Sequence, residues 1–310
     1  MKALGLSFGR KNRNSDIMVK QVLKQMKTRG YEVDFINLNE LNIQNCTGCT
    51  GCVVNLMQGG NGACILKDDF HIVEEAFKEA DAIVVCAPVF CLSPNGLFKT
   101  FCDRMGPSHD ISFLTNARKQ GEEMGKPEDK LPDKRWFKPR AAALMVVGGA
   151  STQNWVSFGL PSMFELFSNG MHIVDAYSAH GAMEYEHMVG NEKLMDRMKL
   201  MGDHLADALE TEGGLEKWYG DTEGTCPVCH NDLLTITHKG TCVECPVCGI
   251  SGELKIENGQ IRVEFSPEEI NRSRLKYAGK LEHYLEIRNS AMTMKKIPDL
   301  KERLAAFKEI

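Results

Sequence analysis

The sequence predicts an α/β fold in which a doubly wound, five-stranded parallel sheet is followed by a small cysteine-rich domain and terminal helices. Apolar runs of strand length alternate with helical periodicity five times, which is typical of a parallel sheet with helices on both faces. Residues 81–88 contain one continuous apolar run, as expected of a strand buried on both faces. Cysteine pairs and a glycine-rich boundary then indicate a second unit. The predicted segments are residues 1–212, 221–265 and 266–310.

The elements of the sheet domain can be placed from their periodicity. We predict strands at residues 3–6, 31–38, 81–88, 141–147 and 172–179. Amphipathic helices are predicted after them, at about residues 15–26, 68–80, 97–105, 155–167 and 194–208. Cys86, Cys91 and Cys102 have apolar neighbours and are expected to be buried as small hydrophobic residues.

Composition narrows the classes of function. A net charge of −5 gives no bulk attraction to nucleic acid or to an anionic membrane. No apolar run approaches the roughly 18 residues that a membrane span needs. The first seven residues read as a strand and not as a signal peptide. Twelve cysteines, mostly in Cys-x2-Cys groups, therefore indicate metal or redox chemistry in a reducing cytoplasm, and a disulfide framework is the weaker interpretation.

Three loops are expected to meet at the carboxyl edge of the sheet, where doubly wound folds bind their ligands. They are residues 7–15, 88–96 and 148–153. The first is rich in hydroxyl and amide side chains and leads into a helix N-terminus, a combination that favours a phosphate. Such loops also cap helices without binding anything, so the first loop alone leaves both interpretations open.

A run of closely spaced cysteines follows the second strand. Cys46, Cys49 and Cys52 stand at three-residue spacing, and Cys64 follows after eleven intervening residues. Four thiolates in one short loop are the ligand set of an iron–sulfur cluster, here predicted as 4Fe–4S. Gly48 and Gly51 would let the loop turn tightly between the cysteines. The alternative is a redox dithiol or a loop of reduced cysteines.

These motifs together resemble the flavodoxin-like NAD(P)H-dependent FMN reductases and, within them, the iron–sulfur flavoproteins. The resemblance spans residues 1–205. It rests on the sequence Ser-Phe-Gly-Arg-Lys-Asn-Arg-Asn-Ser at 7–15, the four cysteines with Asp68 and Asp69, the motif Pro-Val-Phe at 88–90, Lys99 with Asp103 and Arg104, and Gly148 with Gly149. It implies an FMN oxidoreductase that receives electrons from NAD(P)H or from a carrier such as a ferredoxin.

The resemblance also assigns residues to the cofactor. The phosphate of FMN would be held by Ser7, Arg10, Asn12, Asn14 and Ser15, and Arg13 adds a charge where the family often has a small residue. The isoalloxazine ring would be bordered by Pro88, Val89, Phe90, Cys91, Gly148 and Gly149. No catalytic side chain is expected beyond the flavin itself, because the cofactor carries the redox chemistry.

Residues 107–139 are an insertion with four prolines, mixed charge and little periodicity. We expect a segment without regular structure that acts as a lid over the flavin or as an arm to a neighbouring subunit, and a solvated loop is the alternative. Phe113, Leu114, Trp136 and Phe137 would anchor it.

The C-terminal segment contains two Cys-Pro-x-Cys pairs, and its four cysteines are Cys226, Cys229, Cys245 and Cys248. Four thiolates at this spacing predict a closed tetrahedral site, either the zinc of a zinc ribbon or rubredoxin-like iron. Strands at 233–238 and 254–265, the latter turning at Asn258-Gly259, would form the ribbon. Its charges form no basic face, so nucleic-acid binding is not expected. Helices are expected from Ser266 to Ile310.

Three functions fit these observations. The first is an enzyme that passes electrons between NAD(P)H or a carrier protein, FMN and the 4Fe–4S cluster. The second is a cluster-free FMN reductase of quinones with redox thiols in the cysteine loop, and the third is an electron-carrier subunit of a larger complex. A homo-oligomer, dimer or tetramer, fits all three because flavin sites of the resembled family are usually completed by a neighbouring subunit. His180 and His187, near a ligand-edge strand, are the histidines worth testing.

Overall fold

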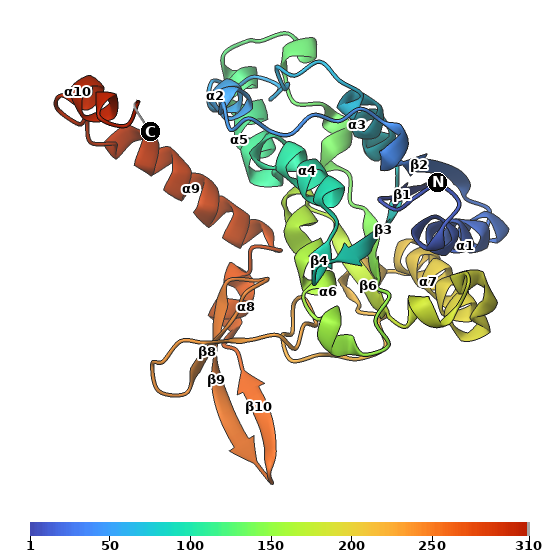
Figure 1. The fold of residues 1–310 in the computed structure, drawn as a ribbon. Helices are drawn as coiled ribbons and strands as arrows, with labels where there is room; N and C mark the ends of the chain where they lie inside the picture. The colour runs from blue at the N-terminus through green and yellow to red at the C-terminus, as the bar shows by residue number, and fades with distance from the viewer. Residues whose placement is uncertain (309–310) are drawn as a thin grey trace.

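The computed structural model describes residues 1–308, with the side chains of 107 and 167–169 left out of the description, and it confirms the predicted fold class (Figure 1). Five parallel strands run in the order β2-β1-β3-β5-β6, the order of a flavodoxin-like sheet. Their bounds are Lys2–Ser7 for β1, Glu32–Asn37 for β2, Ala82–Phe90 for β3, Ala141–Val147 for β5 and His172–Ala179 for β6. A short strand, β4 (Ser93–Pro94), pairs antiparallel with the end of β3.

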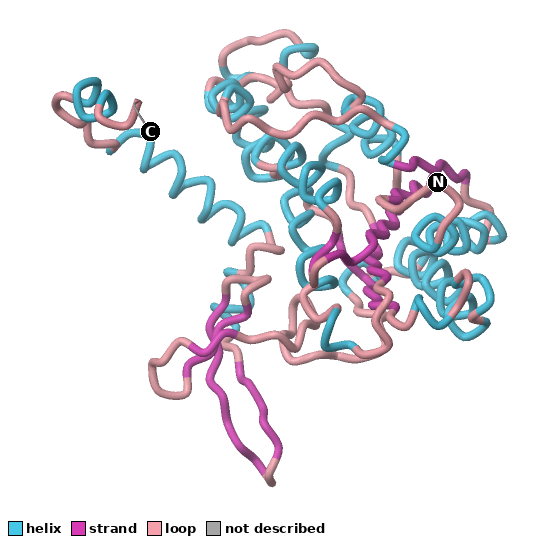
Figure 2. Tube along the Cα trace, viewed as in Figure 1, coloured by secondary structure: helices cyan, strands magenta, loops and turns pink. Residues whose placement is uncertain are grey.

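Helices cover both faces of the sheet (Figures 1 and 2). One face packs against α1 (Asn14–Thr28) and α7 (Glu192–Glu210), whose buried side chains join those of alternate strand residues. The other face packs against α3 (Phe70–Glu79), α4 (Gly96–Met105) and α6 (Gly159–Met163). β5 is buried along its whole length and β3 over its first six residues, as the continuous apolar run predicts.

The insertion differs from its prediction, because it is ordered and helical. It contains α5 (Ile111–Glu123), which packs against α2 (Gly51–Met57) of the cysteine loop and against α9 of the C-terminal segment. Phe113, Leu114 and Trp136 are buried in the main core, as expected of anchoring residues. Asp110 caps α5 by accepting a hydrogen bond from the Ser112 N–H, a signal that sequence periodicity alone does not reveal. The expectation of a segment without regular structure is therefore wrong, since a packed helix occupies this segment.

The C-terminal segment forms a small antiparallel sheet in the order β10-β9-β8-β7. Its strands are Thr235–Ile236 (β7), Cys242–Cys245 (β8), Ile250–Glu257 (β9) and Gln260–Glu264 (β10). Asn258 and Gly259 both have positive φ, which gives the predicted two-residue hairpin turn. The buried cysteines of this sheet belong to the same core cluster as α3 and α4, so the two units share one apolar interface.

Three helices end the described chain: α8 (Pro267–Arg272), α9 (Tyr277–Thr293) and α10 (Leu300–Ala305). Ser266 caps α8 as predicted, but the helix stops at Ser273 and does not continue through Leu275. Figure 1 shows α9 extending from the small sheet, and the Tyr284 ring packs edge-on against Phe113 of α5 at 4.8 Å. The predicted end at Ile310 lies outside the described residues. Among residues 1–308, no helix has the length and apolar character that a membrane crossing requires.

Candidate active site

The first loop leaves β1 and folds back on the start of α1. Ser7 is buried, and its hydroxyl donates to Asp16 Oδ1 at 2.5 Å. Asp16 also accepts the backbone N–H of Asn12 at 2.7 Å and the side-chain amide of Asn37 at 2.8 Å. The Asp16 carboxylate therefore fixes the shape of the loop from its inner side. The Ser7 hydroxyl contributes by donating to this carboxylate. Asp16 was not identified from the sequence as a residue of the site, because an acidic residue in the first turn of a helix is common in helices generally.

The outer side of the same loop carries three cationic side chains, of which Lys11 pairs with Glu40 at 2.5 Å. Arg10 and Arg13 are exposed, and within the described residues neither guanidinium has a hydrogen bond or ion pair. Arg13 is the N-cap residue of the 15-residue helix α1, and its side chain offers no acceptor to the N–H groups of the first turn. Two free arginines beside an uncapped helix N-terminus suit a phosphate group.

The remaining predicted phosphate residues lie in or beside this loop. The Asn14 side-chain oxygen accepts the Met188 N–H at 3.1 Å, and His187 Nε2 lies 3.1 Å from the Asn12 carbonyl oxygen. The loop is thereby tied to the segment that follows β6. Ser15 is buried beneath Gly9, facing the thiol of Cys86. Burial raises the pKa of Cys86 to about 12, so this thiol stays protonated, as expected of a structural cysteine.

The second loop is a tight hairpin at the end of β3. Cys91 and Leu92 occupy its two turn positions with φ of 47° and 76°. Residues other than glycine rarely adopt such positive φ values. Cys91 is therefore exposed at a turn, and the expectation that it is buried is wrong. Phe90 is 62% exposed although it is aromatic. The Asn95 side-chain amide donates to the Phe8 carbonyl at 2.8 Å, which joins this loop to the first.

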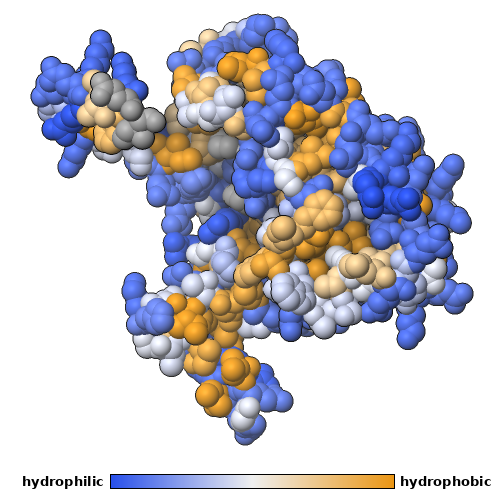
Figure 3. All heavy atoms as spheres, viewed as in Figure 1, coloured by the Kyte–Doolittle hydropathy of each residue, from blue (hydrophilic) through white to orange (hydrophobic). Residues whose placement is uncertain are grey.

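The third loop begins at Gly148, whose N–H donates to the Ala179 carbonyl at 2.8 Å while its own carbonyl accepts the Ala182 N–H at 3.1 Å. A Cβ at Gly148 would lie 2.2 Å from Val156 Cγ1, so the close contact with Val156 requires glycine. β1, β3 and β5 are neighbours in the sheet, and their three loops thus lie together at its carboxyl edge, as predicted. In the face of the molecule that Figure 3 shows, hydrophobic residues gather in the middle.

The cysteine loop leaves the same edge after β2, and an ion pair closes its base. Arg104 of α4 donates through both terminal nitrogens to Asp68, and one of them also donates to the Gln44 carbonyl at 3.0 Å. Asp68 in turn accepts the Gln44 N–H at 2.8 Å. Gln44 precedes Cys46 and Asp68 follows Cys64, so Arg104 clamps both ends of the cysteine loop.

The four cysteines of this loop differ in exposure. Cys46 and Cys49 are exposed, whereas Cys52 and Cys64 are half-buried. Burial raises the pKa of Cys52, and the nearby sulfurs of Cys64 and Cys46 raise it further. At Cys49, a hydrogen bond from the Gly51 N–H and another from the Thr47 hydroxyl lower the thiol pKa. Among the described residues, no three of these four sulfurs lie as close together as the ligands of one metal ion, so the loop as folded does not gather the predicted cluster ligands.

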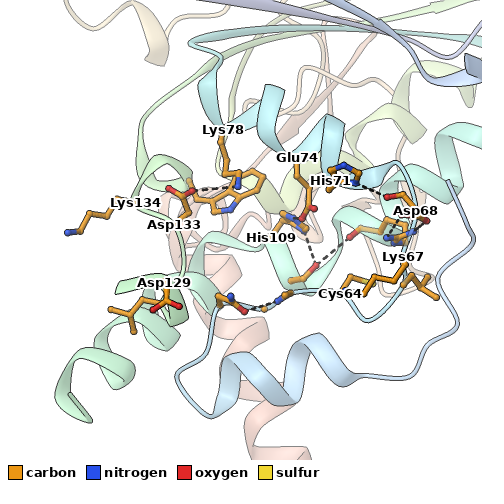
Figure 4. Close-up of a pocket in the computed structure, with 18 of the residues that line it drawn as sticks. Cys64, Lys67, Asp68, His71, Glu74, Lys78, His109, Asp129, Asp133 and Lys134 are labelled. Atoms are coloured by element: carbon orange, nitrogen blue, oxygen red, sulfur yellow. Dashed lines mark hydrogen bonds and ion pairs between the residues drawn. The ribbon is translucent and has the colours of Figure 1, made fainter. Parts of the chain in front are cut away.

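A cavity of about 860 Å³ opens beside Cys64, between the cysteine loop, α3 and the insertion (Figure 4). Its wall contains a buried polar chain: Ser108 Oγ lies 2.8 Å from His109 Nδ1, and His109 Nε2 lies 2.8 Å from Glu74 Oε1. Arg104 also lines this cavity, and its Nε is buried without a hydrogen-bond partner among the described residues. The cavity lining is polar and apolar in nearly equal parts, and the cavity lies on the insertion side of the cysteine loop.

The second cysteine group lies in the small sheet. All four sulfurs of Cys226, Cys229, Cys245 and Cys248 lie within 4.8 Å of one another, and all four residues are buried. The Cys226–Cys248 and Cys229–Cys245 sulfur separations are 3.7 and 3.5 Å. A tetrahedral metal with bonds of about 2.3 Å to sulfur requires separations of about 3.8 Å, so the group fits one zinc or iron ion.

Comparisons with known proteins agree with this geometry. The profile of a family described as NADPH-dependent FMN reductase matches residues 1–184. A solved structure described as flavone reductase is 26% identical, with a TM-score of 0.83, and the match covers 100% of this chain and 98% of that one. A curated protein of Aspergillus candidus, flavone synthase cfoJ, is 26% identical over 98% of this chain and 95% of its own length. An iron–sulfur flavoprotein of Archaeoglobus fulgidus is 34% identical, over 34% of this chain and 46% of its own length.

Proposed function

Since the chain belongs to the NADPH-dependent FMN reductase family and is an FMN oxidoreductase, we propose that it uses NAD(P)H to reduce a planar aromatic ketone of the flavone class. The observation that carries this proposal is the likeness to the flavone reductase structure along the whole chain. That likeness includes the insertion and the C-terminal metal domain, both outside the usual flavodoxin-like core. The match to the iron–sulfur flavoprotein, by contrast, covers about a third of this chain.

The chemistry is a two-electron exchange at a carbon–carbon double bond conjugated to a ketone. Bound FMN would supply the hydride chemistry, as flavins do. In the overall reaction NAD(P)H and one proton are consumed, the double bond gains two hydrogens, and NAD(P)⁺ leaves. The names of the two full-length relatives describe making a flavone and reducing one, which are opposite directions of such an exchange.

The residues of the first loop support a role in holding FMN. Arg10 and Arg13 carry unneutralised charge beside an uncapped helix N-terminus, as a phosphate requires. Asn12, Asn14 and Ser15 complete the proposed phosphate loop, and Ser7 orders it through Asp16. The exposed Phe90 and the close-packed Gly148 and Gly149 would border the ring, together with Pro88, Val89 and Cys91.

A cluster on the cysteine loop is a second candidate feature of the same enzyme. It is favoured by the three-residue spacing of Cys46, Cys49 and Cys52 and by the match of the Archaeoglobus iron–sulfur flavoprotein. Cys64 would be the fourth ligand. The C-terminal cysteines would hold zinc, or iron, as a structural centre, and neighbouring subunits would complete a homo-oligomer.

The experiment is a cofactor analysis joined to an activity assay on anaerobically purified protein. We expect one FMN and one zinc per chain and NAD(P)H oxidation that depends on added flavone. Protein without flavin, or flavin-containing protein that leaves flavone unreduced, would contradict the proposal. About four iron and four sulfide that disappear in Cys49→Ala would support the cluster. No iron or sulfide in wild type would leave these residues as thiols.

A further inference from the structure

A second cavity, of about 460 Å³, lies between the free edge of β6, α6 and the linker and first cysteine turn that precede the small C-terminal sheet. Its volume is within the range of small-molecule sites. Residues from four separate segments line it, among them Gln153, Val156, Tyr177, His180, Trp218 and His230. The cavity exists because the C-terminal domain packs against the sheet domain at this edge.

The cavity adjoins the loop that is proposed to border the flavin ring. Val156 lines it and also contacts Gly148, where a Cβ would be only 2.2 Å from Val156 Cγ1. The hydrogen bonds of Gly148 to Ala179 and Ala182 bring the carboxyl end of β6, including His180, to the same place. Val156 thus contacts the ring loop and lines the cavity.

The wall contributed from the C-terminal half is aromatic and fixed in position. The rings of Trp218 and His230 are stacked, with centroids 4.0 Å apart and planes inclined by 11°. Trp218 Nε1 donates to the Thr222 carbonyl at 2.6 Å, and His230 Nδ1 lies 2.8 Å from the Glu223 carbonyl oxygen. A rigid pair of flat rings is a suitable surface for another flat ring system.

Three polar side chains that line the cavity are free to bind a ligand through hydrogen bonds, although the Arg197 guanidinium lies over the Tyr177 ring at 4.9 Å. Within the described residues, the side chains of Gln153, Tyr177 and His180 make no hydrogen bond or ion pair. Burial raises the pKa of Tyr177, so its hydroxyl remains a donor at neutral pH. An apolar, aromatic cavity with a few free polar groups is the usual design of a site for an oxygenated aromatic ligand.

We propose that this cavity binds the aromatic ring system of the electron acceptor, and that the C-terminal metal domain is therefore part of the substrate site. The inference rests on the proposed function for the acceptor's class, an aromatic ketone with further oxygen substituents. Trp218 would stack on the ligand, and Tyr177 and Gln153 would donate to its oxygens. The C-terminal domain would thus determine acceptor specificity for a flavin site that lies in the other domain.

The test compares Trp218→Ala with Trp155→Ala in the holoenzyme, with flavone as the probe. Trp155 belongs to the same surface region and is 67% exposed, but it does not line the cavity. We expect Trp218→Ala to raise the dissociation constant of flavone in equilibrium dialysis, and its KM, at least tenfold. Trp155→Ala should change both less than twofold. Flavin and zinc per chain are measured for each variant to show that it is folded.

If Trp218→Ala loses its metal, the exposed Gln153→Ala replaces it, with an expected rise of threefold or more in the dissociation constant. A folded Trp218→Ala or Gln153→Ala with the wild-type dissociation constant would overturn the inference. Wild-type protein that fails to bind flavone in dialysis would overturn it as well. The proposed function has a separate criterion, namely FMN content and flavone-dependent NAD(P)H oxidation by wild type, so the two failures can be told apart.

Discussion

Arg104 and Asp68 form a two-pronged ion pair in which both side chains are 2% exposed. Through it, α4 is joined to both ends of the cysteine loop, because Asp68 and Arg104 each also bind the backbone of Gln44. The Arg104 guanidinium also lies over the Phe70 ring at 4.5 Å. The position of the cysteine loop relative to the sheet therefore depends on one buried contact.

Removing one member of this pair should be costly. Arg104→Met would leave the Asp68 carboxylate buried without its cation, and such losses cost about 3–5 kcal/mol. We expect urea unfolding to show a loss of this order, with faster hydrogen exchange across residues 44–69. Lys199→Met is the matched control, since its partner Asp196 is 71% exposed and exposed pairs contribute at most about 1 kcal/mol. Equal effects of the two substitutions would contradict the clamp.

The same pair predicts how stability depends on pH. Burial opposes ionisation of Asp68, but hydrogen bonds from Arg104, Gln44 and Phe70 outweigh it, and its pKa lies below the ordinary value. A carboxyl group with a lowered folded-state pKa stabilises the fold above its unfolded pKa of about 3.9 and loses that contribution as the pH falls. Wild type should exceed Asp68→Asn in unfolding free energy at pH 7, and the difference should shrink below about pH 4. Urea titrations at several pH values check this, and a difference that grows in acid would refute it.

The sheet domain could be predicted because its signals are local. Continuous apolar runs define β3 and β5, and Asn258-Gly259 specifies a hairpin whatever surrounds it. Loop positions at the carboxyl edge followed from the alternation of strands and helices, which predicts a parallel sheet. The prediction for the insertion was wrong because α5 packs against two segments that are distant in the sequence, α2 and α9. Such packing is hard to recognise in a short window of sequence.

The residues that shape the site were harder to predict for the same reason. Asp16, Asn95 and Arg104 each act through partners 9 to 87 positions away in the chain. The aromatic pair of Trp218 and His230 likewise forms when the linker folds back on the first cysteine turn. Cysteine spacing, in contrast, predicted the four-sulfur group because both pairs sit on tight turns that the motif itself encodes.

Metal removal should affect the C-terminal domain selectively. Cys245→Ser would break the four-sulfur set, whereas Cys242→Ser, at a half-buried cysteine of the same strand outside that set, should keep it. We expect Cys245→Ser to lose one metal ion per chain and hydrogen-exchange protection across β7–β10, because metal binding supplies folding energy to such small domains. The sheet from β1 to β6 should keep its protection. Loss of metal in Cys242→Ser, or its retention in Cys245→Ser, would contradict the assignment.

The first loop gives a prediction that separates phosphate binding from binding of the flavin ring. Arg10→Ala and Arg13→Ala each remove a free guanidinium beside the N-terminus of α1. Hydrogen bonds to charged groups contribute about 1.5–3 kcal/mol, so each substitution should weaken FMN binding roughly 10- to 100-fold. Riboflavin lacks the phosphate, and its affinity for the apoprotein should stay the same within twofold in both variants. Fluorescence titration of apoprotein with each flavin measures this difference. Equal losses for FMN and riboflavin would mean that the arginines support the loop's shape and do not bind phosphate, because only a phosphate contact distinguishes the two ligands.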